Sequence, residues 1–474
     1  MSPTPLWQYS AGALHHAFLT QQATPVQALQ SCLDRIAQVQ PQLNAFVAMR
    51  AEQALQEAQA STLRYQQACP LSVLDGVPVS IKDNLLTQDL PTTWGCSSLV
   101  GYQPAQEELA VTRLRQAGAL IVGKTNVPEF TLEGYTDNPV FGVTRNPWNL
   151  ALTPGGSSGG AAASVAAGCT PLALGTDGGG SIRRPAAHCG IVGLKPTIGT
   201  VARVDGLPRI LLDFEVVGLM ARSASDVQLL LSVVAGPDAQ DPASWAAACQ
   251  RQQFSPPEPA SPPQLLYVPT LEDAPVDPAI AAACAQAAMQ LGCHSSTGSL
   301  PLQLGAINAG WSQVGHIGLA FLFAQAPQWA QQASHKYLDM AAQGAQVPAT
   351  RLWALQEAVQ QLRRDCARLF ERWDVVAMPC TAAQPWPAQQ AYPAEINGQA
   401  VGPRGHAAMT GWVNAAGLPA ISIPVAFDAQ GLPMGLQLIA APGNEALLLE
   451  LATRFAAQHP LRWPPLELSA TAPA

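Results

Sequence analysis

Three consecutive glycines, Gly178, Gly179 and Gly180, stand directly before Ser181 in the stretch GTDGGGSIRRPA. Glycine lets the backbone turn so that successive N–H groups point into one hollow. Such a hollow holds the oxyanion that develops beside a serine nucleophile, and losing one donor typically costs about 2.7–4 kcal/mol of barrier. The stretch therefore predicts a nucleophile, Ser181, with an oxyanion hole formed by the three glycines.

A serine nucleophile needs a base, and Lys82 is a candidate because it ends an apolar run in GVPVSIKDN. A free lysine has a pKa near 10.4 and is protonated at neutral pH, whereas burial disfavours the charged form. Holding the amine neutral at pH 7 costs about 4–5 kcal/mol, at 1.36 kcal/mol per pKa unit. Such a cost is reasonable at a functional site. Local sequence equally allows an ion pair between Lys82 and the adjacent Asp83. We interpret His188, seven residues beyond Ser181, as structural.

A second glycine-rich stretch, TPGGSSGGAAA, contains Ser157 and Ser158. It matches neither the P-loop pattern nor the dinucleotide-binding pattern, which disfavours a phosphate cradle. Gly155 to Gly159 do match G-x-S-x-G, the nucleophile elbow, with Ser157 at its centre. That hypothesis also needs a preceding strand and a downstream histidine. Asn149–Pro154 is not strand-like and no histidine is obviously placed, so the elbow is the weaker alternative.

Composition narrows the classes of protein further. Of 474 residues, 48% are hydrophobic and 12% charged, which indicates a large buried core, and the net charge is -8 with no Lys/Arg-rich run. We expect no nucleic-acid partner.

The chain has no secretory signal and no uninterrupted apolar stretch of membrane length, so we expect no membrane span. Ten scattered cysteines favour reduced thiols and a cytoplasmic location. No His/Cys cluster has metal-ligand spacing, and we expect neither a metal nor a cofactor.

The elements that must position these residues alternate between helix and strand. Residues 8–60 have helical periodicity. Strands are expected at Val77–Ile81, Leu120–Val122, Leu172–Leu174, Val375–Met378, Ala420–Val425 and Gly435–Ile439. Helices are expected at Glu107–Ala117, Ser158–Ala167 and Leu352–Trp373. This alternation predicts an α/β fold with a central sheet covered by helices.

The second half of the chain is predicted to carry a variable addition to the sheet. Residues 240–370 are interpreted as a cap segment, Ala/Gln-rich and helical from about 270, with Trp311, Phe321, Phe323 and Trp329. Ser255–Pro263 is a linker by composition, and Pro464–Ala474 a loose tail. We expect one domain over residues 1–474, with the cap segment inside it.

The chain resembles the amidase signature family. The resemblance rests on motifs that follow one another in order: GVPVSIKDN, LPTTWGCSSL, GKTNVPEF, NPWN, TPGGSSGGAAASVAAG, GTDGGGSIRRPAA and GIVGLKPT. The later GLPAISIP and GLPMGLQLIA are similar to the C-terminal strands of that family. Residues 240–370 match no motif. The resemblance implies the amidase signature fold, a mixed central β-sheet with helices on both faces.

The resemblance also implies roles. Lys82 is the base, Ser157 the bridging serine and Ser181 the nucleophile, and the peptide bond between Gly156 and Ser157 is cis. In one place the chain departs from the family, which commonly carries a side chain at the position of Gly178. The departure predicts a more mobile oxyanion loop or open space beside the acyl group.

Five further residues are assigned by position. Asp177 and Arg183 are expected to brace the oxyanion loop. Ser158 is expected to hydrogen-bond nearby or to begin a helix. Arg184 stands where relatives can contact substrate, so an acidic acyl group is one candidate ligand. Tyr135 is either a pocket wall or part of the core.

The implied activity is hydrolysis of an amide bond through a Ser181 acyl-enzyme. The apolar, aromatic residues 305–330 favour a small hydrophobic acyl or aryl amide, with esters, anilides or carbamates as further substrates. One alternative is the glutaminase component of a tRNA-dependent amidotransferase. Another is an inactive binding protein on the same fold. The expected partner is a small-molecule amide, and a homodimer is possible.

Overall fold

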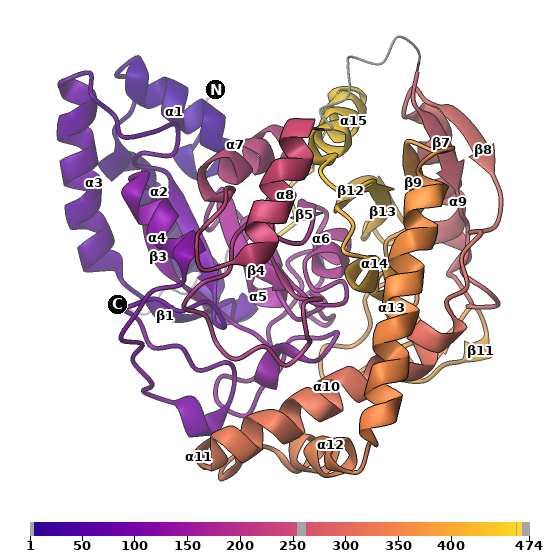
Figure 1. Ribbon diagram of the computed structural model, residues 1–474. Coiled ribbons are helices and arrows are strands. Elements are labelled where there is room, and N and C mark those ends of the chain that lie inside the picture. The colour runs from indigo at the N-terminus through magenta and orange to yellow at the C-terminus, as the bar shows by residue number, and fades with distance from the viewer. Residues whose placement is uncertain (1–3, 254–261, 461, 467–474) are drawn as a thin grey trace.

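The computed structural model describes residues 4–253, 262–460 and 462–466 (Figure 1). Apart from residues 262–263 and 464–466, the linker predicted at Ser255–Pro263 and the tail predicted at Pro464–Ala474 lie outside these residues.

The core of the fold is one mixed sheet of eleven strands. Their order across the sheet is β1-β3-β2-β4-β6-β5-β12-β13-β9-β7-β8. The strands are β1 Phe46–Met49, β2 Pro78–Lys82, β3 Leu120–Thr125, β4 Leu172–Asp177, β5 Val192–Lys195, β6 Val216–Ala221, β7 Gln264–Tyr267, β8 His294–Thr297, β9 Val375–Pro379, β12 Ala420–Phe427 and β13 Pro433–Ala440. A separate hairpin joins β10 Glu395–Ile396 to β11 Gln399–Ala400.

Fifteen α-helices surround the sheet within the described residues. They are α1 Ala11–Leu19, α2 Pro25–Leu43, α3 Ala51–Gln66, α4 Leu109–Gln116, α5 Gly159–Ala166, α6 Arg183–Cys189, α7 Ala224–Val234, α8 Pro242–Gln253, α9 Pro278–Gln290, α10 Gly305–Gln325, α11 Pro327–Ala330, α12 His335–Ala345, α13 Ala349–Leu369, α14 Gly411–Ala416 and α15 Glu445–Gln458.

Helices cover both faces of the sheet. Successive side chains of a strand point to opposite faces. In β9, Val375 and Ala377 belong to one hydrophobic cluster, which includes buried side chains of α1, α7, α9 and α15. Val376 and Met378 belong to a second cluster, which includes side chains of α10, α13 and α14. The predicted α/β class, with a mixed sheet between two helical layers, is confirmed.

Two expectations about local structure are wrong. Residues 8–60 are not helical throughout, because Phe46–Met49 forms the edge strand β1, which pairs with β3. The cap segment is not helical from 270 onward, because His294–Thr297 forms β8, which pairs with β7 and extends the sheet. Both strands are four residues long, too short for a period of two to stand out. The helices of the cap segment are α8–α13, of which α10–α12 lie along the lower edge of the molecule in Figure 1.

The pairing of two parallel strands positions the chemistry. β2 lies beside β4, with Val79 opposite Leu172 and Ile81 opposite Leu174. Parallel strands end at the same edge, so Lys82 and Asp177 are brought to one edge of the sheet.

The tiny side chains of α5 allow a close approach to the neighbouring backbone. A Cβ on Gly160 would lie only 2.5 Å from the Asn126 nitrogen.

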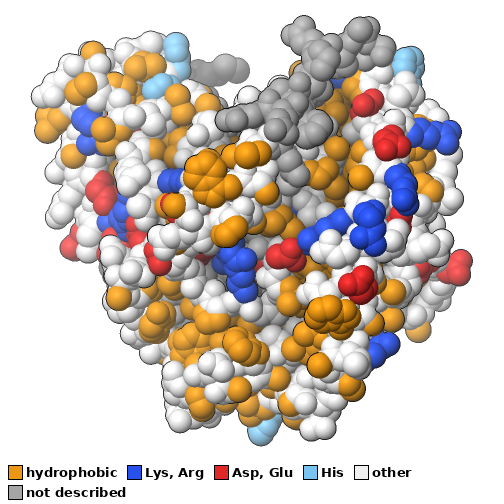
Figure 2. Space-filling model, in the orientation of Figure 1, with side chains coloured by type: hydrophobic (Ala, Val, Ile, Leu, Met, Phe, Trp, Pro, Cys, Tyr) orange, Lys and Arg blue, Asp and Glu red, His pale blue; other side chains and the backbone are white. Residues whose placement is uncertain are grey.

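The surface carries few charges. On the face in Figure 2, Lys and Arg side chains form small groups mixed with Asp and Glu, between uncharged and hydrophobic side chains. This face shows no continuous basic area of the kind that binds a phosphate backbone.

Candidate active site

Lys82 is fully buried at the end of β2 and its amine points at a serine. Lys82 Nζ lies 2.8 Å from Ser157 Oγ, 2.9 Å from Thr176 Oγ1 and 3.2 Å from the Thr176 carbonyl oxygen. Burial lowers the pKa of Lys82 to about 7, and the charges of Glu215 and Asp177 oppose this only in part. A substantial fraction of the amine is therefore neutral at pH 7, as a general base requires.

The acidic neighbour of Lys82 in the chain has another partner. A carboxylate oxygen of Asp83 lies 3.5 Å from Nζ of Lys124, with both side chains buried. The same carboxylate accepts hydrogen bonds from the Thr93 N–H and hydroxyl. The alternative that Lys82 pairs with Asp83 at the surface is therefore wrong, because both side chains are buried and Asp83 is held by Lys124 and Thr93.

A sharp turn carries Ser157. The Gly156–Ser157 peptide bond is cis, as the family resemblance implied. Gly156 has no room for a side chain, because a Cβ would collide with the carbonyl oxygen of Tyr135. Tyr135 thus touches the site through its backbone, and its ring lies 5.7 Å from the Lys336 amine.

Ser158 ties this turn to the two neighbouring segments. Its N–H donates to the Ser181 carbonyl oxygen at 3.2 Å, and its hydroxyl donates to the Thr176 carbonyl oxygen at 3.1 Å. These bonds hold Ser181 beside the turn that carries Ser157. Ser158 also directly precedes the first residue of α5, and its side chain forms no capping bond to that helix.

Asp177 shapes the loop that carries Ser181. Its carboxylate accepts hydrogen bonds from the backbone N–H groups of Gly180 at 2.7 Å and Ile182 at 3.1 Å. The side chains of Arg183 and Asn414 donate to it as well, each at 2.9 Å. Burial alone would raise the pKa of Asp177, but the Arg183 charge and these bonds hold it well below its usual range. The loop is thus built around a buried carboxylate.

The same bonds reduce the number of backbone N–H groups that are candidates for binding an oxyanion. The N–H of Gly180 is occupied by Asp177. Within the described part of the chain, the N–H groups of Gly178, Gly179 and Ser181 donate to no protein acceptor. Gly180 has φ +112°, a conformation that favours glycine, and its α-carbon faces Thr410. Its role is to shape the turn.

The space beside Gly178 is already occupied. A Cβ on Gly178 would lie 2.5 Å from Cδ1 of Leu211 and 3.4 Å from Cβ of Glu215. The expectation that this glycine leaves open space beside the acyl group is therefore wrong. The departure from the family pattern makes room for Leu211, a residue distant in the chain.

A cavity of about 540 Å³ reaches this part of the molecule at Leu211 and Arg184, and Lys82, Ser157 and Ser181 do not line it. It is bounded by apolar and charged side chains together: Leu132, Glu133, Arg184, Leu211, Trp311, His316, Lys336, Met340, Tyr392, Arg404 and His406, with backbone between them. Of the four aromatic residues noted in the cap segment, Trp311 lines this cavity. Phe323 and Trp329 pack against another hydrophobic cluster, and Phe321 is exposed.

Arg184 is a buried cation with few partners. It is 4% exposed, its Nη2 donates one long bond of 3.4 Å to the Gly156 carbonyl oxygen, and its Nε has no partner among the described residues. Burial, followed by the nearby charge of Arg404, lowers the pKa of Arg184 to about 9. The side chain borders the cavity next to the turn that carries Ser157.

Sequence reasoning missed several residues that the fold brings to the site. Thr176, a partner of Lys82, stands beside Asp177 in the glycine-rich motif, and its place at the end of a strand was a usable signal. Asn414, which holds Asp177, and Trp311, which touches Gly179, come from distant segments. Nothing local in the sequence indicates these contacts.

His188 is buried behind the site. Burial lowers its pKa to about 3, and its ring packs edge-on against Trp386 at 5.6 Å. The described residues include no cluster of metal-ligating side chains, and no helix among them is long and apolar enough to cross a membrane.

Comparisons with known proteins agree with this geometry. A family model described as Amidase matches residues 27–449. The chain is 35% identical to the A subunit of glutamyl-tRNA(Gln) amidotransferase from Symbiobacterium thermophilum, over 94% of this chain and 96% of that protein. A bacterial aryl acylamidase of the amidase signature family superposes with a TM-score of 0.86 at 27% identity, over 96% of this chain and 97% of that one. The structure of 6-aminohexanoate cyclic dimer hydrolase with substrate superposes with a TM-score of 0.83 at 28% identity, over 98% of this chain and 99% of that one.

The fold and these matches define the class of protein, a hydrolase that acts on carbon–nitrogen bonds of amides. More particularly, the chain belongs to the amidase signature family.

Proposed function

We propose that this amidase hydrolyses small amides through an acyl-enzyme on Ser181, with Ser157 as proton relay and Lys82 as base. The observation that carries the proposal is the contact of 2.8 Å between Lys82 Nζ and Ser157 Oγ, at a lysine whose pKa burial lowers to about 7. A lysine that serves only the fold has no need of a neutral amine against a serine hydroxyl.

In the proposed mechanism, neutral Lys82 accepts the proton of Ser157 while Ser157 accepts that of Ser181. The Ser181 oxygen attacks the amide carbon, and the oxyanion is bound by N–H groups of Gly178, Gly179 and Ser181. The relay then runs in reverse, the protonated leaving amine departs, and the acyl group stays on Ser181 as an ester. Water, deprotonated through the same relay, hydrolyses the ester.

The lining of the cavity of about 540 Å³ supports the proposed substrate class. Trp311, Leu132, Leu211 and Met340 offer apolar contact to a hydrophobic acyl or aryl group, and esters, anilides or carbamates would use the same acyl-enzyme. Arg184 is the proposed contact for a polar or acidic substituent on such a group.

Covalent labelling tests the nucleophile. An activated fluorophosphonate is expected to label Ser181, and labelling should be absent in Ser181→Ala. Labelling of Ser157 instead would support the nucleophile elbow. Folded protein that takes no label, and hydrolyses no member of a panel of aryl and alkyl amides, would support the inactive binding protein.

The second candidate is the glutaminase component of a tRNA-dependent amidotransferase. It is favoured by the 35% identity to one component of such an enzyme over nearly the whole chain. The test is glutamine hydrolysis, by the chain alone and together with the other components of such a complex. Release of ammonia from glutamine only in that complex, with no turnover of aryl and alkyl amides, would replace the first candidate.

We also infer a cytoplasmic location, because all ten cysteines are free and most are buried. Cell fractionation tests this inference, and recovery of the protein outside the cytoplasmic fraction would overturn it. The homodimer stays a prediction that sedimentation can check.

A further inference from the structure

A second cavity, of about 440 Å³, shares a wall with the first. Trp311, Ser312 and Arg404 border both cavities. The shared wall reaches the oxyanion loop, because a Cβ on Gly179 would lie 3.0 Å from Cζ2 of Trp311 and 3.7 Å from Nη2 of Arg404. A substrate held at Ser181 therefore has two directions in which to extend past Trp311.

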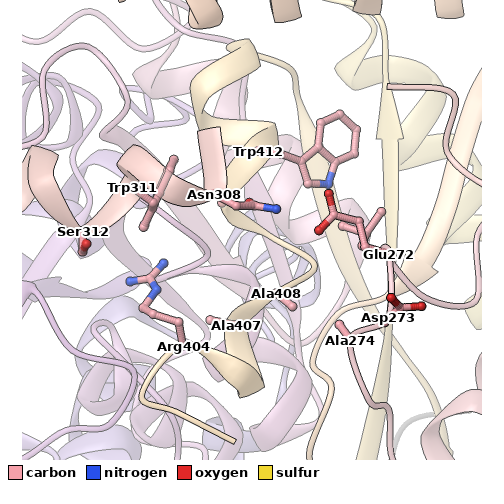
Figure 3. A pocket seen from close by; sticks show the side chains of 12 residues that line it. Glu272, Asp273, Ala274, Asn308, Trp311, Ser312, Arg404, Ala407, Ala408 and Trp412 are labelled. Carbon is pink, nitrogen blue, oxygen red and sulfur yellow. The ribbon is translucent and has the colours of Figure 1, made fainter. Parts of the chain in front are cut away.

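The two cavities differ in charge. The first carries Arg184 and Lys336 with one acid, Glu133, and Arg404 borders both cavities. The far wall of the second carries two acids, Glu272 and Asp273 (Figure 3). Neither carboxylate forms an ion pair within the described residues. Two free carboxylates on one wall of a cavity complement a cationic group.

A buried donor in the same wall lacks an acceptor. Trp412 is 2% exposed, borders the second cavity, and its indole N–H has no partner among the described residues. Figure 3 shows the indole nitrogen on the side of the ring that faces Glu272, and the Asn308 amide extending toward the same place. A buried N–H without an acceptor is unfavourable, so a ligand atom that accepts from it would be favoured.

We propose that the second cavity binds the amino terminus of a peptidyl amide. The ammonium group would face Glu272 and Asp273, and the carbonyl oxygen next to it would accept from the Trp412 N–H. A peptide amino terminus presents these two groups on neighbouring carbons, and the Asn308 amide can pair with the N–H or C=O that follows. This inference rests on the proposed function, since it extends the substrate of the Ser181 site.

The test compares peptide amides of the form H-(Gly)n-Phe-NH2, with n from 0 to 4, with the same peptides acetylated at the amino terminus. At pH 7 most of the free α-amino groups are protonated. Glu272 and Asp273 are exposed, so at the length that spans both cavities the native enzyme is expected to prefer the free peptide by about fivefold in kcat/KM, the upper effect of an exposed ion pair. In the double variant Glu272→Gln/Asp273→Asn, the ratio of kcat/KM for the free peptide to kcat/KM for the acetylated peptide is expected to fall to about 1, because the ammonium group has lost its anionic partners.

Glu371→Gln is the matched control, because Glu371 is an exposed acid outside both cavities and should leave the ratio at its native value. Equal kcat/KM for free and acetylated peptides at every length would overturn the inference while leaving the amidase activity intact. A preference that survives in the double variant would also overturn it. Absence of any turnover, of peptides and of neutral anilides alike, would instead count against the proposed function.

Discussion

Lys124, not Lys82, is the partner of Asp83: Lys124 Nζ lies 3.5 Å from the Asp83 carboxylate, and both side chains are buried. The Lys124 amine is also bonded to the Leu85 carbonyl oxygen at 2.6 Å and the Thr92 hydroxyl at 2.7 Å. Two buried lysines thus lie at the ends of neighbouring parallel strands, and their side chains have different partners. One neutralises a carboxylate, and the other is left facing a serine.

The Lys124→Met variant should lose stability but keep its amidase activity. Removing one partner leaves a buried charge uncompensated, which typically costs about 3–5 kcal/mol. Urea denaturation measures the free energy of unfolding, and the double variant Lys124→Met/Asp83→Asn should recover part of the loss. A single variant within about 0.5 kcal/mol of the native protein, the usual range for surface substitutions, would show that the pair contributes little.

The pH dependence of kcat/KM should report Lys82. Because burial lowers its pKa to about 7, the amine is neutral above that pH and protonated below it. With a neutral anilide, log kcat/KM is expected to rise with unit slope up to about pH 7 and then level off. Fluorophosphonate labelling of Ser181 should follow the same curve. A profile that stays flat down to pH 5 would exclude Lys82 as the base.

Gly178→Ala should lower activity because of Leu211. The added Cβ would lie 2.5 Å from Leu211 Cδ1, so either the leucine or the oxyanion loop must move. Cδ1 is the free end of a flexible, half-buried side chain, so we expect a loss well short of the hundredfold in kcat that displacing an oxyanion donor costs. The double variant Gly178→Ala/Leu211→Ala removes the clash and should regain most of the activity. If the double variant is as slow as the single one, the clash with Leu211 is not the cause.

Asp177→Asn should slow acylation because it disturbs the loop that carries Ser181. The amide that replaces the carboxylate keeps its size but weakens the bond to Arg183 and replaces one acceptor by a donor. We expect kcat/KM to fall by roughly a hundredfold or more, the effect of a misplaced oxyanion donor, and the labelling rate of Ser181 to fall with it. Asp365→Asn, in α13 and outside both cavities, is the control and should change neither rate. An unchanged labelling rate in Asp177→Asn would show that this carboxylate does not position Ser181.

Much of the site could be predicted from the sequence because its residues stand in contiguous motifs. Ser181 follows its glycines, Ser157 has its own glycine-rich turn, and Asp177 and Arg183 lie within six residues of each other around the loop. The strands Val77–Ile81 and Leu172–Leu174 were expected within a few residues of where they lie, since their apolar runs are short and bounded by turns.

The tertiary structure alone decided the questions that depend on contacts between distant segments. The sequence left Lys82 undecided between a base and an ion pair with Asp83, because adjacent residues in a chain need not be neighbours in space. Burial of the amine at the end of β2, 2.8 Å from Ser157, resolves the ion-pair alternative. The sequence by itself predicted an oxyanion loop, because a serine stands beside three glycines. Only packing decided that Asp177 occupies the N–H of Gly180 and that Leu211 fills the space beside Gly178, because both follow from how the loop sits among its neighbours.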